Sequence, residues 1–281
     1  MRRKEIVKFI TRMVEDGGLT FSDYAVKLEE IVKGLSLEDI KMSLIECGVI
    51  PESFSHDSTE EKLYSKYSDM LLARTLTFMG IDSKVIKERA DAADVEGRTK
   101  DYTLVADGKV FRLSRTAKNQ KDFKVEALDK WRGAKDFACL VSPLYQYPKN
   151  KSQIYRQAIG RNVTLLSYIH LYFILSQNKP NKFNYKPLWL VGKKLKGAKG
   201  AITYWKAIDK TLCSILNKNL KEIEKVKKLE LDLLKGSAKE EMAYIDGKIE
   251  TIKALPHNEA IDRLIKSEKL DRKINQIKRL S

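Results

Sequence analysis

Apolar residues recur at helical spacing in the first fifty residues of the chain. The apolar positions of the first predicted helix are Ile6, Phe9, Ile10 and Met13. This spacing of three and four residues is that of one buried helix face. Gly17 and Gly18 interrupt the pattern, and Ser36 with the acids after it is typical of a new helix start. Residues 1–48 are therefore predicted to form two or three short helices.

A loop over residues 51–57 separates this region from a longer predicted helix. Ser58 and Glu61 have the spacing of a capping box, which marks a helix N-terminus. The helix is expected to run to about Phe78 and to end at Gly80. Its expected buried face consists of Leu63, Tyr67, Leu71 and Leu72.

Short β-rich runs then alternate with helical segments. The predicted strands are residues 102–106, 110–113, 136–142 and 163–166. The predicted helices between and after them are residues 119–132, 151–160 and 167–175. The pattern indicates an α/β core, which we place at residues 49–178.

The C-terminal part of the chain has a helical pattern throughout. Residues 198–281 are rich in Lys, Glu, Leu and Ile and predict two or three long helices. Breaks are expected near Gly236–Ser237 and at Pro256. Residues 179–281 thus form a predicted helical C-terminal region, whose charged residues are interpreted mainly as a solvated helix face.

Charge is the first indication of function. The 281 residues include 54 Lys and Arg against 38 Asp and Glu, a formal net charge of +16. Such a surplus attracts polyanions, and nucleic acid is the leading candidate over a merely soluble basic protein. The three cysteines lie far apart without a CxxC pair, which argues against a zinc site or a disulfide framework. No signal peptide or membrane span is visible, so a cytoplasmic location is expected.

The triplet Asp107-Gly108-Lys109 follows one of the predicted strands and suggests a catalytic site. Because strand side chains alternate, Asp107 and Lys109 are predicted to point to the same side. Asp94 can join them if it lies at the end of a neighbouring strand. Two carboxylates suit Mg²⁺, with the Gly108 carbonyl as a further ligand, and a lysine can hold the attacking water. By itself the triplet is a weak signal, because such triplets occur by chance in a Lys-rich chain, and a cross-strand ion pair is the alternative.

The order of elements around the triplet supports the catalytic interpretation. An acidic helix comes first, then strands that bear Asp94 and Asp107, then a helix and the strand at 136–142. This α-β-β-β-α-β order is that of the PD-(D/E)xK nuclease core. We therefore predict a restriction-endonuclease-like α/β fold, with a central mixed sheet flanked by helices and helical extensions at both ends.

A longer block of sequence resembles a known family. Residues 105–128 are similar to the HindIII family of type II restriction endonucleases, and so are residues 58–66, 93–95 and 151–154. The resemblance covers roughly residues 49–172. Two departures stand out: Ala93 replaces the usual proline, and Gly108 replaces a bulkier residue. Neither removes a metal ligand.

The resemblance implies a homodimeric, Mg²⁺-dependent enzyme that cuts double-stranded DNA. The implied target is the palindrome AAGCTT, cut after the first A to leave 5′ overhangs that end in 5′-phosphate. A cognate DNA methyltransferase is expected as a functional partner, because an unprotected host genome would be cut.

Further residues are candidates for accessory roles. Glu61 is either a helix-borne acid that orients a water or a second metal, or the capping-box partner of Ser58. Asp122 is a further candidate acid, against the alternative of a helix-dipole contact. The expected DNA-binding residues are Arg112, Arg115, Lys118, Asn119 and Lys121. Asn119 is favoured for base contact, whereas phosphate contact alone remains the alternative for the others.

Two other function classes remain open from the sequence. A sequence-specific DNA-binding protein that has lost catalysis would bind AAGCTT without cutting it. A non-specific basic RNA-binding module would bind with steep salt dependence and no sequence preference.

Overall fold

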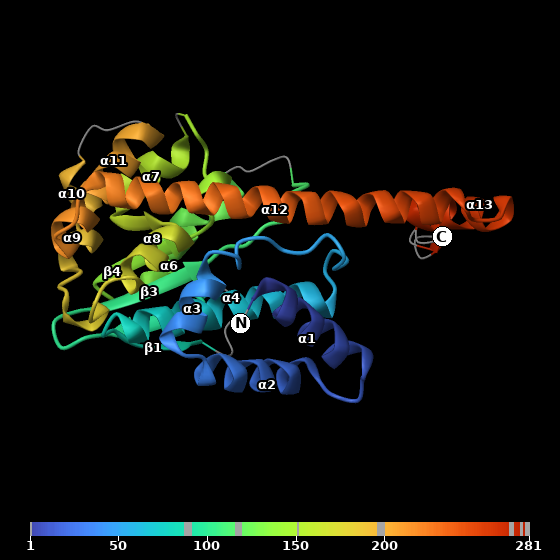
Figure 1. Cartoon of the computed structure of the whole chain (residues 1–281), viewed down its shortest axis with the longest axis horizontal. Coiled ribbons are helices and arrows are strands. Elements are labelled where there is room, and N and C mark those ends of the chain that lie inside the picture. The colour runs from blue at the N-terminus through green and yellow to red at the C-terminus, as the bar shows by residue number, and fades with distance from the viewer. Residues whose placement is uncertain are drawn as a thin grey trace. The chain divides into compact units, whose positions relative to one another are not determined.

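A mixed β-sheet organises the computed structural model (Figure 1). Its five strands among the described residues are β1 (Asp82–Val85), β2 (Val95–Arg98), β3 (Thr103–Gly108), β4 (Phe137–Val141) and β5 (Val163–Leu166). They lie in the order β1-β2-β3-β4-β5. The pairs β1–β2 and β2–β3 are antiparallel, and the pairs β3–β4 and β4–β5 are parallel. This confirms the predicted central mixed sheet.

The structure describes residues 2–86, 92–115, 120–150, 152–195, 200–269, 273–275 and 278. The helices up to the last strand are α1 (Arg3–Glu15), α2 (Phe21–Gly34), α3 (Leu37–Leu44), α4 (Thr59–Phe78), α5 (Gln120–Phe123), α6 (Val125–Arg132), η1 (Leu144–Gln146) and α7 (Gln153–Arg161). The later helices are α8 (Tyr168–Leu175), η2 (Pro180–Lys182), α9 (Lys186–Trp189), α10 (Val191–Lys194), α11 (Ala201–Leu216), α12 (Leu220–Lys253) and α13 (His257–Ser267).

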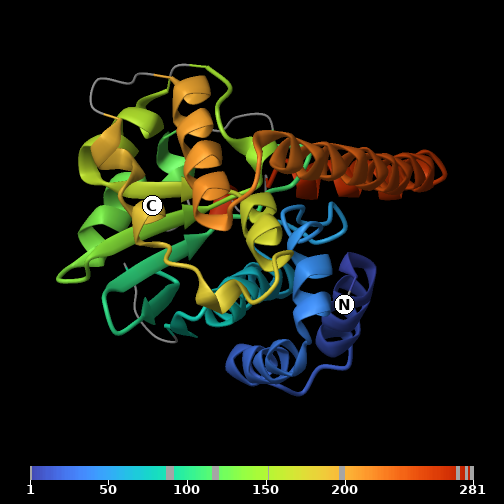
Figure 2. The ribbon, with the colours of Figure 1, turned by 60° about the vertical axis from the view of Figure 1, so that its left-hand side comes forward.

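Helices cover different parts of the sheet. Helix α4 packs against β1, β2 and β3, and α6 packs against β3, β4 and β5. The three N-terminal helices α1–α3 in turn pack on α4, as the blue and teal ribbons in Figure 2 show. Helix α4 therefore lies between the sheet and another helical layer.

This position explains the burial of α4. The Ser58 hydroxyl caps it by accepting a hydrogen bond from the Glu61 backbone N–H at 3.2 Å, and Gly80 follows it with a φ of +85°. The residues predicted for the buried face are all buried: Leu63, Tyr67, Leu71 and Leu72. The helix is also buried on other sides, including at Tyr64, Ser68 and Asp69. A helix between two layers has little face left for water.

Two predicted elements differ from the observed ones. Residues 110–113 do not form a strand; they contribute only an isolated bridge between Phe111 and Val49. The chain leaves the sheet after β3 because it pairs instead with the loop near Gly48. The helix predicted over 119–132 is two helices, interrupted at Lys124 with a φ of +47°; its residue 119 lies outside the described residues.

The C-terminal region confirms the break at Pro256 but not the one at Gly236–Ser237. Helix α12 continues through both residues without interruption. The chain divides into two compact units, Met1–Ser237 and Ala238–Ser281. The first unit contains the whole sheet, and the predicted region boundaries after residues 48 and 178 stay predictions. No helix in the described part of the chain combines the length and the apolar character needed to cross a membrane.

Candidate active site

The strand register brings Asp94 and Asp107 opposite each other. Val95 pairs with Ala106 across the antiparallel strands β2 and β3, so the preceding Asp94 lies opposite Asp107. Lys109 follows β3 directly. Its backbone N–H donates to the Val141 carbonyl at 2.8 Å. The main chain that bears the triplet is thus held by strands on both sides.

The three predicted side chains meet in space. The Lys109 Nζ donates to the Asp107 Oδ1 at 2.7 Å and lies 2.6 Å from the Oδ2. It also lies 4.0 Å from the Asp94 Oδ2. The Asp107 side chain is 1% exposed, so this ion pair is largely removed from water. Alternation along β3 had predicted that Asp107 and Lys109 share one side, and the structure confirms it.

A third carboxylate, which the sequence interpretation missed, belongs to the same cluster. Asp69 lies on α4 and is 4% exposed. A Cβ on Gly108 would come within 3.2 Å of the Asp69 Oδ1 and within 3.3 Å of the Tyr168 hydroxyl. Glycine within the triplet therefore allows α4 to approach β3 closely. The sequence signal that could have identified Asp69 is its position as a single acid within the apolar stretch of α4.

Burial and crowding raise the pKa values of two of these acids. Burial, followed by the neighbouring Asp94 charge, raises the pKa of Asp69 well above its ordinary value. Burial also raises the pKa of Asp107, against the opposing effect of Lys109. Burial lowers the pKa of Lys109, but the charges of Asp107 and Asp94 outweigh it, so the lysine pKa is raised overall. The lysine stays charged at neutral pH and offsets only part of the negative charge.

The donor set fits a divalent metal ion. Three carboxylates supply hard oxygen ligands, which Mg²⁺ and Ca²⁺ prefer. One lysine, Lys109, faces Asp94 and Asp107 and offsets only part of the negative charge of the three acids, and the neighbouring Asp94 charge is one cause of the raised pKa of Asp69. A divalent cation would relieve the repulsion among the acids.

Glu61 makes contacts of a different kind. Its Oε1 lies 2.5 Å from the Arg112 Nη1, and its Oε2 accepts a hydrogen bond from the Asp57 backbone N–H at 2.6 Å. The second half of the predicted capping box is thus replaced by these contacts. Glu61 also lies near His56, with 3.4 Å between its Oε2 and the Nδ1. Within the described ranges, the exposed His56 and Asp57 and the partly buried Glu61 form the one group of three acid, histidine or cysteine residues whose ligand atoms all lie within 4.8 Å of one another.

The remaining predicted residues lie downstream of the triplet. Arg115 and Asp122 form an ion pair, and the Arg115 side chain is half-exposed. Lys121 is exposed at the start of α5. Lys118 and Asn119 lie outside the described residues. The structure therefore pairs both candidate accessory acids, Glu61 and Asp122, with arginines.

A buried serine, histidine and aspartate also lie in line. The Ser167 Oγ is 2.6 Å from the His170 Nδ1, and the His170 Nε2 is 3.1 Å from the Asp209 Oδ1. Ser167 and His170 are both fully buried, and Ser167 is the N-cap residue of α8. Because substrate cannot reach the serine, this arrangement is a structural link between α8 and α11.

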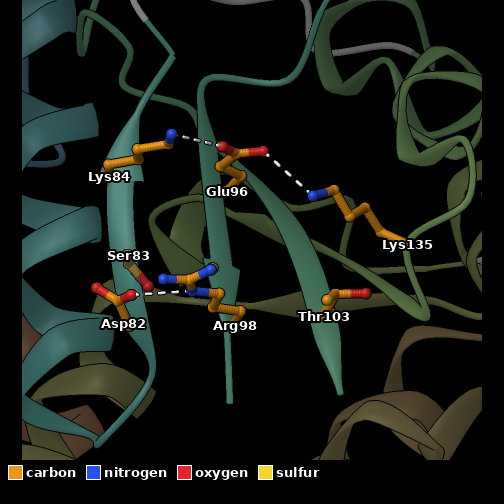
Figure 3. A pocket seen from close by; sticks show the side chains of 8 residues that line it. Asp82, Ser83, Lys84, Glu96, Arg98, Thr103 and Lys135 are labelled. Carbon is orange, nitrogen blue, oxygen red and sulfur yellow. Dashed lines mark hydrogen bonds and ion pairs between the residues drawn. The ribbon is translucent and has the colours of Figure 1, made fainter. Parts of the chain in front are cut away.

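A separate charged pocket lies on the strands away from the triplet (Figure 3). It has a volume of about 230 Å³. Glu96 pairs with Lys84 at 3.1 Å and with Lys135 at 3.3 Å, and Asp82 pairs with Arg98 at 3.1 Å. Its charges are largely matched in exposed ion pairs, each worth little.

Comparison with known proteins covers nearly the whole chain. The family model for the HindIII restriction endonuclease matches residues 4–281. The type II restriction enzyme HindIII of Haemophilus influenzae is 32% identical over 286 residues, which cover 99% of this chain and 95% of that protein. The similarity extends well beyond the window at residues 49–172 and includes the C-terminal helices. The chain therefore belongs to the HindIII restriction endonuclease family and is a type II restriction endonuclease that acts on DNA with a divalent metal ion.

Proposed function

We propose that this enzyme is a Mg²⁺-dependent endonuclease that cuts both strands of AAGCTT after the first A. The observation that carries the proposal is the convergence of Asp94, Asp107 and Lys109 at one point of the sheet. A relative that is 32% identical bears the name HindIII, and the similarity spans the region around these residues. The products would carry 5′-phosphate ends on 5′ overhangs.

The proposed metal ligands are the carboxylates of Asp94 and Asp107 and the backbone carbonyl of Gly108, with Asp69 close beside them. Bound Mg²⁺ would lower the pKa of a coordinated water and offset negative charge on the scissile phosphate. The Lys109 ammonium, held by Asp107, is available to orient the attacking water or to stabilise the developing charge. Water attacks phosphorus, the bond from phosphorus to the 3′ oxygen breaks, and the phosphate stays on the 5′ end.

DNA contacts are proposed for the segment that follows the triplet. Arg115 and Lys121 are exposed there and can reach a phosphate or a guanine edge. Lys118 and Asn119, which lie outside the described residues, remain candidates for the same surface. Arg112 remains a candidate as well, although its guanidinium contacts Glu61.

A palindromic target requires a symmetric enzyme. We expect two copies of the chain to bind AAGCTT as a homodimer, so that each active site cuts one strand. A DNA methyltransferase of the same specificity is the expected functional partner, because it would protect the host genome.

Incubation of the protein with a plasmid that carries AAGCTT and with Mg²⁺ tests the proposal. Discrete fragments whose ends map after the first A are expected. Lys109→Ala should abolish cleavage. Lys84→Ala should not, since Lys84 is paired with Glu96 in an exposed ion pair at 3.1 Å. The proposal would be refuted if the wild type produced no discrete fragments, or if Lys109→Ala cut as the wild type does. Binding of AAGCTT without cleavage would favour an inactive DNA-binding protein.

A further inference from the structure

The chain just downstream of Lys109 is attached to the loop that precedes α4. The Phe111 backbone N–H donates to the Gly48 carbonyl at 3.2 Å, and the Ile50 N–H donates to the Phe111 carbonyl at 3.1 Å. Next, the Ser114 N–H and hydroxyl donate to the two carboxylate oxygens of Glu52 at 3.0 and 2.9 Å. Residues 111–114, where the proposed DNA-contacting segment begins, are therefore attached to the loop before α4 by hydrogen bonds at both Phe111 and Ser114.

Arg112 lies at the centre of this attachment. Besides the ion pair with Glu61, its Nη2 donates to the Phe54 carbonyl at 2.6 Å. Its side chain is 17% exposed and that of Glu61 is 15% exposed. A charge-assisted contact of this kind, largely shielded from water, is stronger and more specific in geometry than an exposed ion pair.

Each side chain of the pair is held at two atoms. Both terminal nitrogens of Arg112 are engaged, by Glu61 and by the Phe54 carbonyl. Both oxygens of Glu61 are engaged as well, by Arg112 and by the Asp57 N–H. These contacts hold the two side chains against one another and against the loop before α4.

Helix α4 connects this pair to the carboxylate cluster. Glu61 lies in its first turn, and Asp69 lies eight residues later on the same helix. At 1.5 Å per residue, the two positions are about 12 Å apart along the axis. Because α4 is buried between two layers, a displacement at Glu61 would be transmitted toward Asp69 rather than absorbed locally.

We propose that Arg112 and Glu61 are positioning residues that fix the DNA-contacting segment relative to the catalytic carboxylates. The proposal rests on the nuclease function proposed above and replaces a direct role for either residue in cutting or base reading. DNA held by the segment after Arg112 would be placed at the metal site through Glu61 and α4. Loss of the pair would let DNA bind but would misplace the scissile phosphate.

The test compares Arg112→Gln, Glu61→Gln and the double variant with the wild type. Each single variant should lower kcat on an AAGCTT duplex by about 10- to 100-fold, which is the scale of a small misplacement. KM and the affinity for the duplex without divalent metal should stay within about twofold of wild type. The double variant should match the worse single variant within about twofold, because one contact is removed in all three.

The Arg98→Gln and Asp82→Asn variants form a matched control, since they break an arginine–aspartate pair on β1 and β2 (Figure 3). They should keep the wild-type kcat. The proposal would be overturned if the kcat losses of the two single variants added up in the double variant. It would also be overturned if only Arg112→Gln weakened the affinity for the duplex, or if only Glu61→Gln lowered kcat. Effects no larger than those of the control pair would overturn it as well.

Hydrogen exchange of the free protein separates this inference from the proposed function. Both variants should accelerate backbone amide exchange over residues 111–115, which needs no DNA or cleavage. If the wild type does not cut AAGCTT but both variants still exchange faster than the wild type, the proposed target is refuted and the inferred attachment stands. Unchanged exchange in both variants would overturn the attachment, whatever the protein cuts.

Discussion

At the scale of single residues, the main finding is the third buried acid. Asp69 is a polar residue within an apolar helix, where a charge without partners would cost several kcal/mol. It is found instead beside Gly108 and the Asp94–Asp107 pair. Its place beside these two carboxylates leads us to propose a role for Asp69 in the active site.

Asp69→Asn tests this role. Removal of the charge should lower the cleavage rate by about 10- to 100-fold, as expected for a group that helps to hold or orient a metal. The thermal unfolding midpoint should not fall, because burial already disfavours the charged form of Asp69. Asp82→Asn, at an exposed aspartate of β1, should keep the wild-type rate. Full activity in Asp69→Asn would show that this carboxylate is only structural.

At the scale of elements, the length of a helix can decide whether it continues through a residue at which the local pattern predicts a break. Gly236 was predicted to interrupt the C-terminal helix, yet α12 continues through it, and a Cβ there would meet nothing within 4 Å. Isolated glycines weaken helices without always breaking them. The neighbouring turns of a helix of 34 residues hold the backbone in place.

Gly236→Ala should therefore stabilise the protein. Alanine restricts the unfolded chain and favours the helix by roughly 0.5–1 kcal/mol. Gly80→Ala should do the opposite, since Gly80 has a φ of +85° and a Cβ would lie 3.0 Å from the Asn181 carbonyl oxygen. Urea unfolding of both variants measures the two free energies. A destabilised Gly236→Ala variant would mean that α12 is not continuous at this residue.

Glu230 on α12 makes stability depend on pH. Burial raises the pKa of this carboxyl to about 7, against smaller opposing effects of the Leu144 backbone and Lys227. The folded protein therefore binds this proton more tightly than the unfolded chain. The contribution to the free energy of unfolding is greatest below pH 4.5 and is lost as the pH rises through 7.

Glu230→Gln removes this dependence. At pH 8 the variant should be more stable than the wild type, by at most about 3 kcal/mol for a change of 2.5 pKa units. At pH 4.5 the two proteins should differ little, because the acid is then protonated. Chemical unfolding at both pH values gives the comparison. If the variant were more stable than the wild type by the same amount at pH 4.5 and at pH 8, the raised pKa of Glu230 would be contradicted.

At the scale of the whole molecule, charge and chain organisation matter most. The net charge of +16 belongs to the entire sequence, whereas the site itself is acidic. Electrostatic attraction to DNA therefore comes from residues outside the carboxylate cluster. The sheet, the site and the proposed DNA-contacting segment all belong to the unit Met1–Ser237.

DNA binding should consequently weaken steeply with salt. If six to ten phosphates are contacted, the affinity for an AAGCTT duplex should fall by about 10³- to 10⁵-fold between 50 and 200 mM salt. Arg115→Gln should reduce the slope of log affinity against log salt by about 1 if Arg115 contacts a phosphate. Fluorescence anisotropy at several salt concentrations measures both quantities. Affinity that does not change with salt would refute the electrostatic interpretation.

Local pattern was sufficient for much of the fold and for part of the site. The apolar run at residues 137–141 is β4, and the caps Ser36 and Ser58 begin helices as predicted. The alternation of strand side chains, continued one residue past β3, was enough to place Asp107 and Lys109 on one side. These features depend on backbone periods and on hydrogen bonds between residues close in sequence, which a single chain segment specifies.

Contacts between distant segments were decided only by the tertiary structure. The short strand β1 has no periodic signal, and residues 110–113 resemble a strand but lie beside Gly48 rather than in the sheet. Asp69 joins Asp107 across 38 residues of sequence, and Arg112 contacts Glu61 across 51. Such pairings arise because packing brings separate elements together to bury apolar surface, and spacing along the chain does not encode which charged residues are then left facing one another.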